Sequence, residues 1–157
     1  MGPAILSGVR LLLGLLLVAS LCAVQPASRA GAQATPEPAA VRVDRDVTYG
    51  EANGEPLLLN IFRPADRDTP RPAVLLIFGG GWMMGGRTEM DTTAQILAQA
   101  GYVAFSIDHR LADGTPEHGW PGQLDDAQRA VRWMRAHAAE YEVDPDRLCS
   151  LGWSSGA

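Results

Sequence analysis

The most constraining feature of this sequence is an alternation of apolar, strand-like runs with amphipathic helical patterns. Residues 73–78 form a continuous apolar run, which is typical of a strand covered on both faces of a parallel sheet. Residues 102–107 are expected to form another apolar strand. Residues 88–100 and 123–139 have the apolar spacing of helices, and a short apolar strand follows at 148–151. Strands that alternate with helices predict a mostly parallel sheet with helices on both faces.

A hairpin is expected before this alternation. Residues 41–49 alternate apolar and polar side chains, and residues 57–62 form a second apolar run. Asn53-Gly54 between them is a strong hairpin turn signal. The predicted fold class is therefore α/β, with a β-hairpin followed by β-α-β-α-β.

Two glycine-rich segments, 79–86 and 152–156, directly follow predicted strands. In open α/β sheets, ligands bind beyond the carboxyl ends of the strands. Residues 152–156, Gly-Trp-Ser-Ser-Gly, form a G-x-S-x-G pattern. A nucleophile on a sharp strand-to-helix turn needs small residues two places before and after it, so that strand and helix can approach. Ser154 is accordingly the candidate nucleophile.

The segment Gly79-Gly80-Gly81-Trp82 allows backbone N–H groups to approach a substrate carbonyl closely. The N–H of Ser155, directly after the nucleophile, is a second candidate oxyanion donor. A phosphate-binding loop of the Walker type is excluded because the chain contains no lysine. Residues 81–86 also lack the G-x-G-x-x-G spacing of dinucleotide-binding loops.

Taken together, these segments resemble the esterase/lipase branch of the α/β-hydrolases, in particular its hormone-sensitive-lipase-like and bacterial feruloyl-esterase-like groups. The resemblance covers about residues 45–157 and implies the N-terminal portion of an α/β-hydrolase fold. The matching segments are Leu-Asn-Ile-Phe-Arg-Pro at 59–64, Phe-Gly-Gly-Gly-Trp at 78–82, Asp-His-Arg-Leu-Ala at 108–112, Trp-Pro-Gly-Gln-Leu-Asp-Asp-Ala at 120–127 and Asp-Pro-Asp-Arg at 144–147.

The resemblance implies that Ser154 attacks a small-molecule carboxylic ester and forms an acyl-enzyme. It also implies that Gly80 and Gly81 supply oxyanion N–H groups. This chain departs from the family pattern at Phe78, where the family has a histidine that helps to hold the loop, and at His109, where it has a tyrosine. At 155–157, Ser-Gly-Ala replaces the usual Ala-Gly-Gly.

A serine nucleophile needs an adjacent base, and in this fold the acid and then the histidine follow the serine along the chain. The sequence ends three residues after Ser154, so we expect a truncated domain that is inactive or unstable by itself. His109, His118 and His137 are poor candidates for the base. Asp108 and Asp126 are expected to be structural anchors and not triad members; they precede the nucleophile.

Two other functions remain open at this point. The same strand-to-helix turn serves amide cleavage, so a serine peptidase of this fold is an alternative. A non-catalytic exported module, or a degenerate fragment, is the alternative from another class. Because the strand before Ser154 comes last, it is expected to lie at an open sheet edge with exposed apolar surface.

Residues 1–32 have the organisation of a secretory signal peptide: a positive charge at Arg10, then an apolar run, and then small residues. Cleavage after Ala32 or Ala34 fits equally well. We predict a linker at 33–44 and the hydrolase domain at 45–157, in a protein that is secreted or periplasmic. An uncleaved N-terminal membrane anchor is the alternative, although the apolar run is shorter than the ~20 residues of a span.

The formal net charge of −5 argues against a nucleic-acid partner, because phosphate binding requires clustered cations. Outside the signal segment Cys149 is the single cysteine, in an apolar run that predicts a buried side chain. No metal-ligand cluster or cofactor motif is evident in the sequence, so we expect no metal and no cofactor. The oligomeric state is not predicted.

Overall fold

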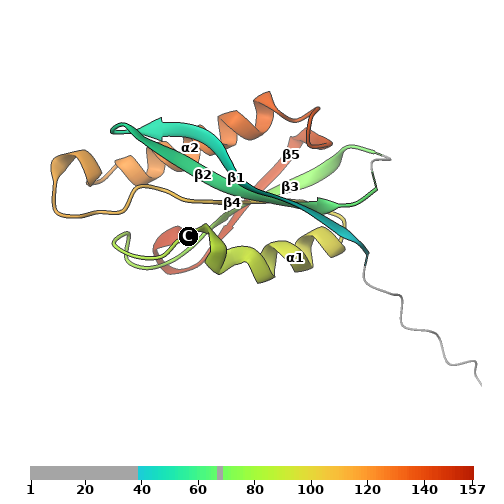
Figure 1. Ribbon diagram of the computed structural model, residues 1–157, viewed down its shortest axis with the longest axis horizontal. Helices are drawn as coiled ribbons and strands as arrows, with labels where there is room; N and C mark the ends of the chain where they lie inside the picture. Colours follow the sequence, from blue (N-terminus) through green and yellow to red (C-terminus); the bar gives the residue numbers. More distant parts are fainter. Residues whose placement is uncertain (1–38, 67–68) are drawn as a thin grey trace, which may run out of the picture. The chain divides into compact units, whose positions relative to one another are not determined.

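The computed structural model describes residues 39–66 and 69–157. The predicted signal peptide and the first part of the predicted linker lie outside the described residues. Figure 1 shows one five-stranded sheet with a helix on each side. The elements are β1 (Val41–Ala52), β2 (Glu55–Pro64), β3 (Arg71–Ile77), the 3₁₀ turn η1 (Arg87–Met90), α1 (Asp91–Gln99), β4 (Val103–Ile107), the 3₁₀ turn η2 (Pro116–His118), α2 (Gly122–Ala136), β5 (Val143–Gly152) and the 3₁₀ turn η3 (Ser154–Gly156).

The sheet is mixed, with the strand order β1-β2-β4-β3-β5. β1, β2 and β4 pair antiparallel, whereas β3 pairs parallel with both β4 and β5. The β1–β2 hairpin closes at Asn53-Gly54, which have φ values of 53° and 82°. Positive φ at both central residues is the geometry of a type I′ turn, so the predicted hairpin is confirmed.

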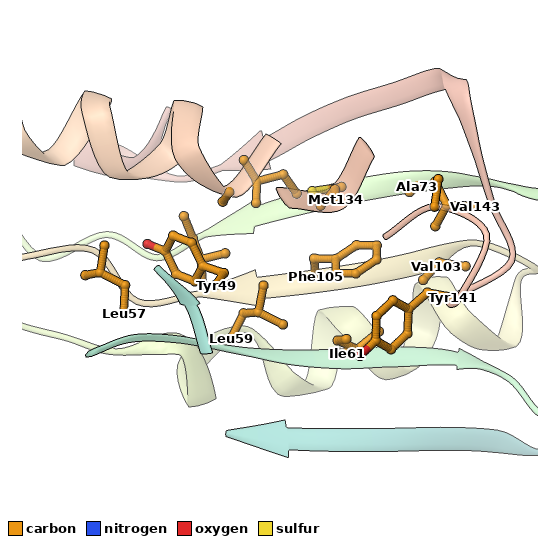
Figure 2. Packing of buried hydrophobic residues seen from close by; sticks show 14 residues of the cluster. Tyr49, Leu57, Leu59, Ile61, Ala73, Val103, Phe105, Met134, Tyr141 and Val143 are labelled. Atoms are coloured by element: carbon orange, nitrogen blue, oxygen red, sulfur yellow. The ribbon is translucent and has the colours of Figure 1, made fainter. Parts of the chain in front are cut away.

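Each helix covers a different face of the sheet with its own apolar cluster. α1 packs small side chains, Ala94 and Ala98, against β2, β3 and β4. α2 contributes Ala130 and Met134 to the larger cluster on the opposite face, part of which is drawn in Figure 2. Phe105 lies at the centre of that cluster, with Tyr141 edge-on to it at 6.1 Å. Helices on both faces were expected from the order of strands and helices.

The start of α2 is held by a buried ion pair. The Asp126 side chain is inaccessible to solvent and accepts hydrogen bonds from the backbone N–H and the guanidinium of Arg110, at 2.7–2.9 Å. These hydrogen bonds outweigh the effect of burial and raise the pKa of Arg110. Asp126 is therefore a structural anchor, as predicted.

β5 is longer than the predicted strand at 148–151 and is interrupted near its start. Its register against β3 jumps between Val143 and Leu148. Within this interruption the N–H of Asp146 donates to the Asp144 carboxylate at 3.0 Å. The predicted turn at 144–146 is thus present, but it is embedded in a strand that begins before it.

The prediction that β5 lies at an open edge is confirmed, since β3 is its only neighbour in the described sheet. The prediction that Cys149 is buried is wrong. Its side chain is exposed, with the thiol donating to the carbonyl of Ala73 at 3.7 Å. The apolar run around Cys149 indicated burial, but no described element covers this part of the edge strand. None of the helices within the described residues has the length and hydropathy of a membrane span.

Candidate active site

The turn after β5 holds Ser154 in an unusual backbone conformation. Gly152 ends the strand, Trp153 is still extended with φ −129°, and Ser154 has φ +52°. Positive φ is uncommon for a residue with a Cβ atom and costs on the order of 1–3 kcal/mol. The sharp strand-to-helix turn expected from the sequence is therefore formed.

The two glycines of the G-x-S-x-G motif lie where no side chain fits. A Cβ atom on Gly152 would be 2.0 Å from the carbonyl oxygen of Gly156. A Cβ atom on Gly156 would be 2.4 Å from the carbonyl oxygen of Ile77 and 2.5 Å from that of Phe78. The steric requirement for small residues on both sides of Ser154 is thus met by backbone contacts with β3 and its exit.

The glycine-rich loop 79–86 lies at the same sheet edge, because β3 and β5 are parallel neighbours that end together, Ile77 opposite Gly152. Gly80 has φ +129°, and a Cβ atom there would be 2.0 Å from the Met84 carbonyl oxygen. Gly81 has φ +63°. Neither the Gly80 nor the Gly81 N–H has a hydrogen-bond partner among the described residues.

Trp82 connects this loop to the serine turn through two hydrogen bonds. Its backbone N–H donates to the Ser155 hydroxyl at 3.3 Å, and its indole N–H donates to the Ser155 carbonyl at 2.9 Å. These contacts hold the loop and the turn in one arrangement although 73 residues separate them in sequence.

A cavity of about 310 Å³ opens beside Ser154. Of the predicted site residues it brings together Ser154 and Gly80, while Gly81 is not part of its wall. Ser155 lines a neighbouring cavity of about 190 Å³ together with Trp82 and Trp120. The wall of the first cavity consists of Gly79, Gly80, Met84, Gly85, Glu89, Trp153 and Ser154.

The start of the loop is held by stacked rings. Phe78 and His109 are both buried, with ring centroids 4.4 Å apart and planes 10° from parallel. The two departures from the family pattern therefore contact each other. Gly85 packs closely on this stack, since a Cβ atom there would lie 2.5 Å from the Phe78 ring.

The far end of the loop is held by Arg87, which the sequence did not single out. Its N–H donates to the Asp108 carboxylate at 2.7 Å, and its guanidinium pairs with both Asp108 and Asp46. Arg87 Nε also donates to Asn60 at 3.2 Å. Although desolvation opposes the charge, the carboxylates of Asp46 and Asp108 raise the pKa of Arg87. Asp108 is thus a loop anchor, as predicted.

None of the three described histidines lines the cavity at Ser154. His118 pairs with Asp113 at 2.7 Å, and hydrogen bonds, chiefly from Thr115, lower the pKa of Asp113. His137 stacks on Trp133 at the end of α2, with centroids 4.1 Å apart. Within the described residues no group of three His, Cys, Asp or Glu side chains is arranged to hold a metal ion.

The sheet, the strained serine turn and the glycine-rich loop define the N-terminal part of an α/β-hydrolase of the esterase/lipase type. Residues 59–157 match the family model BD-FAE, so the chain belongs to this family. The chain is 41% identical over 96 residues to the carboxylesterase NlhH of Mycobacterium tuberculosis, covering 59% of this chain and 28% of that protein. It is 34% identical over 116 residues to the probable carboxylic ester hydrolase LipM of the same species, covering 72% and 26%.

Solved structures show the same relationship. A thermophilic esterase from the Planctomycetes species Thermogutta terrifontis superposes with a TM-score of 0.64 at 33% identity, covering 76% of this chain and 41% of that one. A bacterial heroin esterase has a TM-score of 0.64 at 27% identity, covering 80% and 38%. The chain spans about a quarter of the length of the curated relatives it matches.

Proposed function

We propose that this chain carries the nucleophile and part of the oxyanion hole of a carboxylic ester hydrolase. The observation that supports this most directly is the shared cavity in which Ser154, on a strained turn, faces a loop with unpartnered N–H groups. Hydrogen-bond donors that are already oriented toward the atom where negative charge develops stabilise the transition state by about 2.7–4 kcal/mol each.

In the proposed reaction the Ser154 hydroxyl attacks the ester carbonyl carbon, and its proton passes to a general base. The N–H groups of Gly80, Gly81 and Ser155 stabilise the resulting oxyanion. When the carbonyl reforms, the bond to the alcohol breaks, and the alcohol oxygen takes the proton from the base. Water activated by the same base then hydrolyses the acyl-enzyme and releases the acid and Ser154.

We place the general base outside the described residues, because the described histidines are held away from Ser154. In α/β-hydrolases the acid and the histidine follow the nucleophile along the chain. We therefore expect an aspartate or glutamate and then a histidine encoded beyond codon 157.

The first experiment is to sequence the DNA that follows codon 157 and to express the complete open reading frame. A short-chain p-nitrophenyl ester is a suitable substrate, since the Thermogutta esterase has structures with propionate and butyrate bound. Ser154→Ala should abolish burst and turnover, whereas Ser150→Ala, on the exposed face of β5, should retain both. A stop codon directly after codon 157, or a Ser154→Ala protein as active as wild type, would overturn the proposal.

We also propose that the protein is exported, on the strength of the sequence of residues 1–32. The expected result is a mature protein whose first residue is Gln33 or Thr35, measured by N-terminal sequencing of the protein outside the cytoplasm. A protein that retains Met1 and sediments with membranes would instead support the N-terminal anchor.

A further inference from the structure

The cavity beside Ser154 contains a carboxylate that the proposed ester hydrolysis does not use. Glu89, in η1, lines the cavity wall. Its Oε1 lies against Gly85, 2.9 Å from the position that a Cβ atom would take there. The carboxylate forms no hydrogen bond or ion pair with the residues that the structure describes. It is therefore a negative charge left available to a ligand.

The remaining side chains of the cavity wall are aromatic or polarizable. Trp153 is 57% exposed and Met84 65% exposed, and both line the cavity with Glu89. The Trp153 indole lies along Gly79, where a Cβ atom would be 2.9 Å from its Cδ1 atom. An indole attracts a cation that lies over its face. Glu89 and Trp153 thus present two groups that favour the same kind of ligand.

Among the described residues, no positive charge in the cavity wall competes for Glu89. The part of the wall that the structure describes contains no arginine or histidine. Arg87, two residues before Glu89, is paired with Asp46 and Asp108. A carboxylate on the substrate would be repelled here, whereas an ammonium group would be attracted. The combination of an unpaired carboxylate, an indole and a thioether is suited to a substituted ammonium group.

From this geometry we propose that the cavity beside Ser154 is a subsite for a cationic group of the substrate, a substituted or quaternary ammonium carried by the ester. Glu89 supplies the countercharge and Trp153 supplies the aromatic face. The inference rests on the proposed function, because it takes the ester bond to lie at Ser154. In this proposal Glu89 and Trp153 determine which esters the enzyme prefers.

The experiment compares the binding of two isosteric esters, one cationic and one neutral. Acetylcholine and 3,3-dimethylbutyl acetate have nearly the same shape, but only the first is charged. Their dissociation constants are measured by calorimetry at low ionic strength on the Ser154→Ala variant of the complete open reading frame, so no turnover is required. We expect acetylcholine to bind roughly tenfold more tightly, the sum of an exposed cation–π contact and a partly screened ion pair.

Three variants test whether this preference arises in the cavity. Glu89→Gln should lose several-fold of the preference, whereas Glu117→Gln, the same charge change on an exposed residue of η2, should keep it. Trp153→Leu should weaken acetylcholine more than the neutral ester. Raising the salt concentration should reduce the difference between wild type and Glu89→Gln, because salt screens charge pairs.

Equal affinity for the two esters, or equal losses in Glu89→Gln and Glu117→Gln, would overturn the cationic subsite. This outcome is separable from failure of the proposed function. Hydrolysis without a charge preference would remove the subsite and leave the esterase, whereas a preference without hydrolysis would leave the subsite and remove the esterase.

Discussion

Gly156 lies at the closest approach between the serine turn and β3. Because its added Cβ atom would meet two carbonyl oxygens at 2.4 and 2.5 Å, Gly156→Ala must displace either the turn or β3. We expect a loss of about 1–3 kcal/mol in unfolding free energy, as for other overpacked sites, and a large loss of ester hydrolysis. Urea denaturation and a p-nitrophenyl ester assay measure the two effects.

Gly119→Ala is the matched control. Gly119 has φ −79°, and a Cβ atom there would make ordinary contacts of 3.5 Å. This variant should keep stability and activity. If Gly156→Ala behaved in the same way, the close packing of the turn on β3 would be contradicted.

The Tyr49 phenol makes the free energy of unfolding depend on pH in the alkaline range. Burial, and then the charge of Asp126, raise the pKa of the Tyr49 phenol well above its usual range, and its hydroxyl donates to the carbonyl of Asp108. The folded state therefore favours the neutral phenol. This contribution is fully present below the unfolded-state pKa of about 10 and is lost as the pH rises above that value.

The measurement is the urea midpoint at pH 9 and at pH 11. Wild type should lose up to about 1.4 kcal/mol per pH unit above 10 from this group, whereas Tyr49→Phe should lose less. Tyr49→Phe should also be less stable at pH 7, because the Asp108 carbonyl loses its donor. The exposed Tyr102→Phe serves as control; identical pH slopes for wild type and Tyr49→Phe would rule out this role.

At the scale of elements, the buried Asp126 joins α2 to the segment after β4. Removing it leaves the Arg110 guanidinium, 16% exposed, without its main partner. Breaking a buried ion pair costs about 3–5 kcal/mol, so Asp126→Ala should lose roughly 3 kcal/mol in chemical denaturation.

Asp125→Ala makes the same charge change one residue earlier, at an exposed position of the same helix turn. It should cost less than about 1 kcal/mol, the usual size of a helix-dipole contribution. Similar losses in the two variants would show that the effect belongs to the helix terminus and not to the buried pair.

At the scale of the whole molecule, β5 leaves an apolar sheet edge open. Leu151 is 43% exposed and follows the exposed Cys149. Unpaired edges of this kind template pairing with another chain. We therefore expect residues 36–157, expressed alone, to associate as their concentration rises, measured by light scattering after size-exclusion chromatography.

Leu151→Lys should reduce this association, since charged side chains on an edge oppose strand pairing. The exposed Ile96→Lys, on α1, controls for the added charge. A protein that stays monomeric at every concentration, or equal effects of the two variants, would contradict edge pairing.

The sequence by itself determined the order of strands and helices and the place of the serine turn. Apolar runs and helical spacing indicate which side chains of a segment are buried, and Asn53-Gly54 indicates a local backbone geometry. The strands, helices and hairpin predicted from them are correct because the tertiary packing favours the same local structure. The G-x-S-x-G pattern could likewise be interpreted from the sequence, because the need for small residues around the serine is a local steric requirement. The proximity of the loop 79–86 to Ser154 followed from the predicted topology, because neighbouring parallel strands end at the same edge of a sheet.

Only the tertiary structure decided which distant side chains support the site. Arg87 pairs with Asp46 and Asp108, which lie 41 and 21 residues away in the sequence. Phe78 stacks on His109, which lies 31 residues away. Glu89 shares a cavity with Trp153, and Cys149 is exposed. No local pattern encodes these facts, because each depends on which surfaces the folded sheet brings together and which it leaves uncovered.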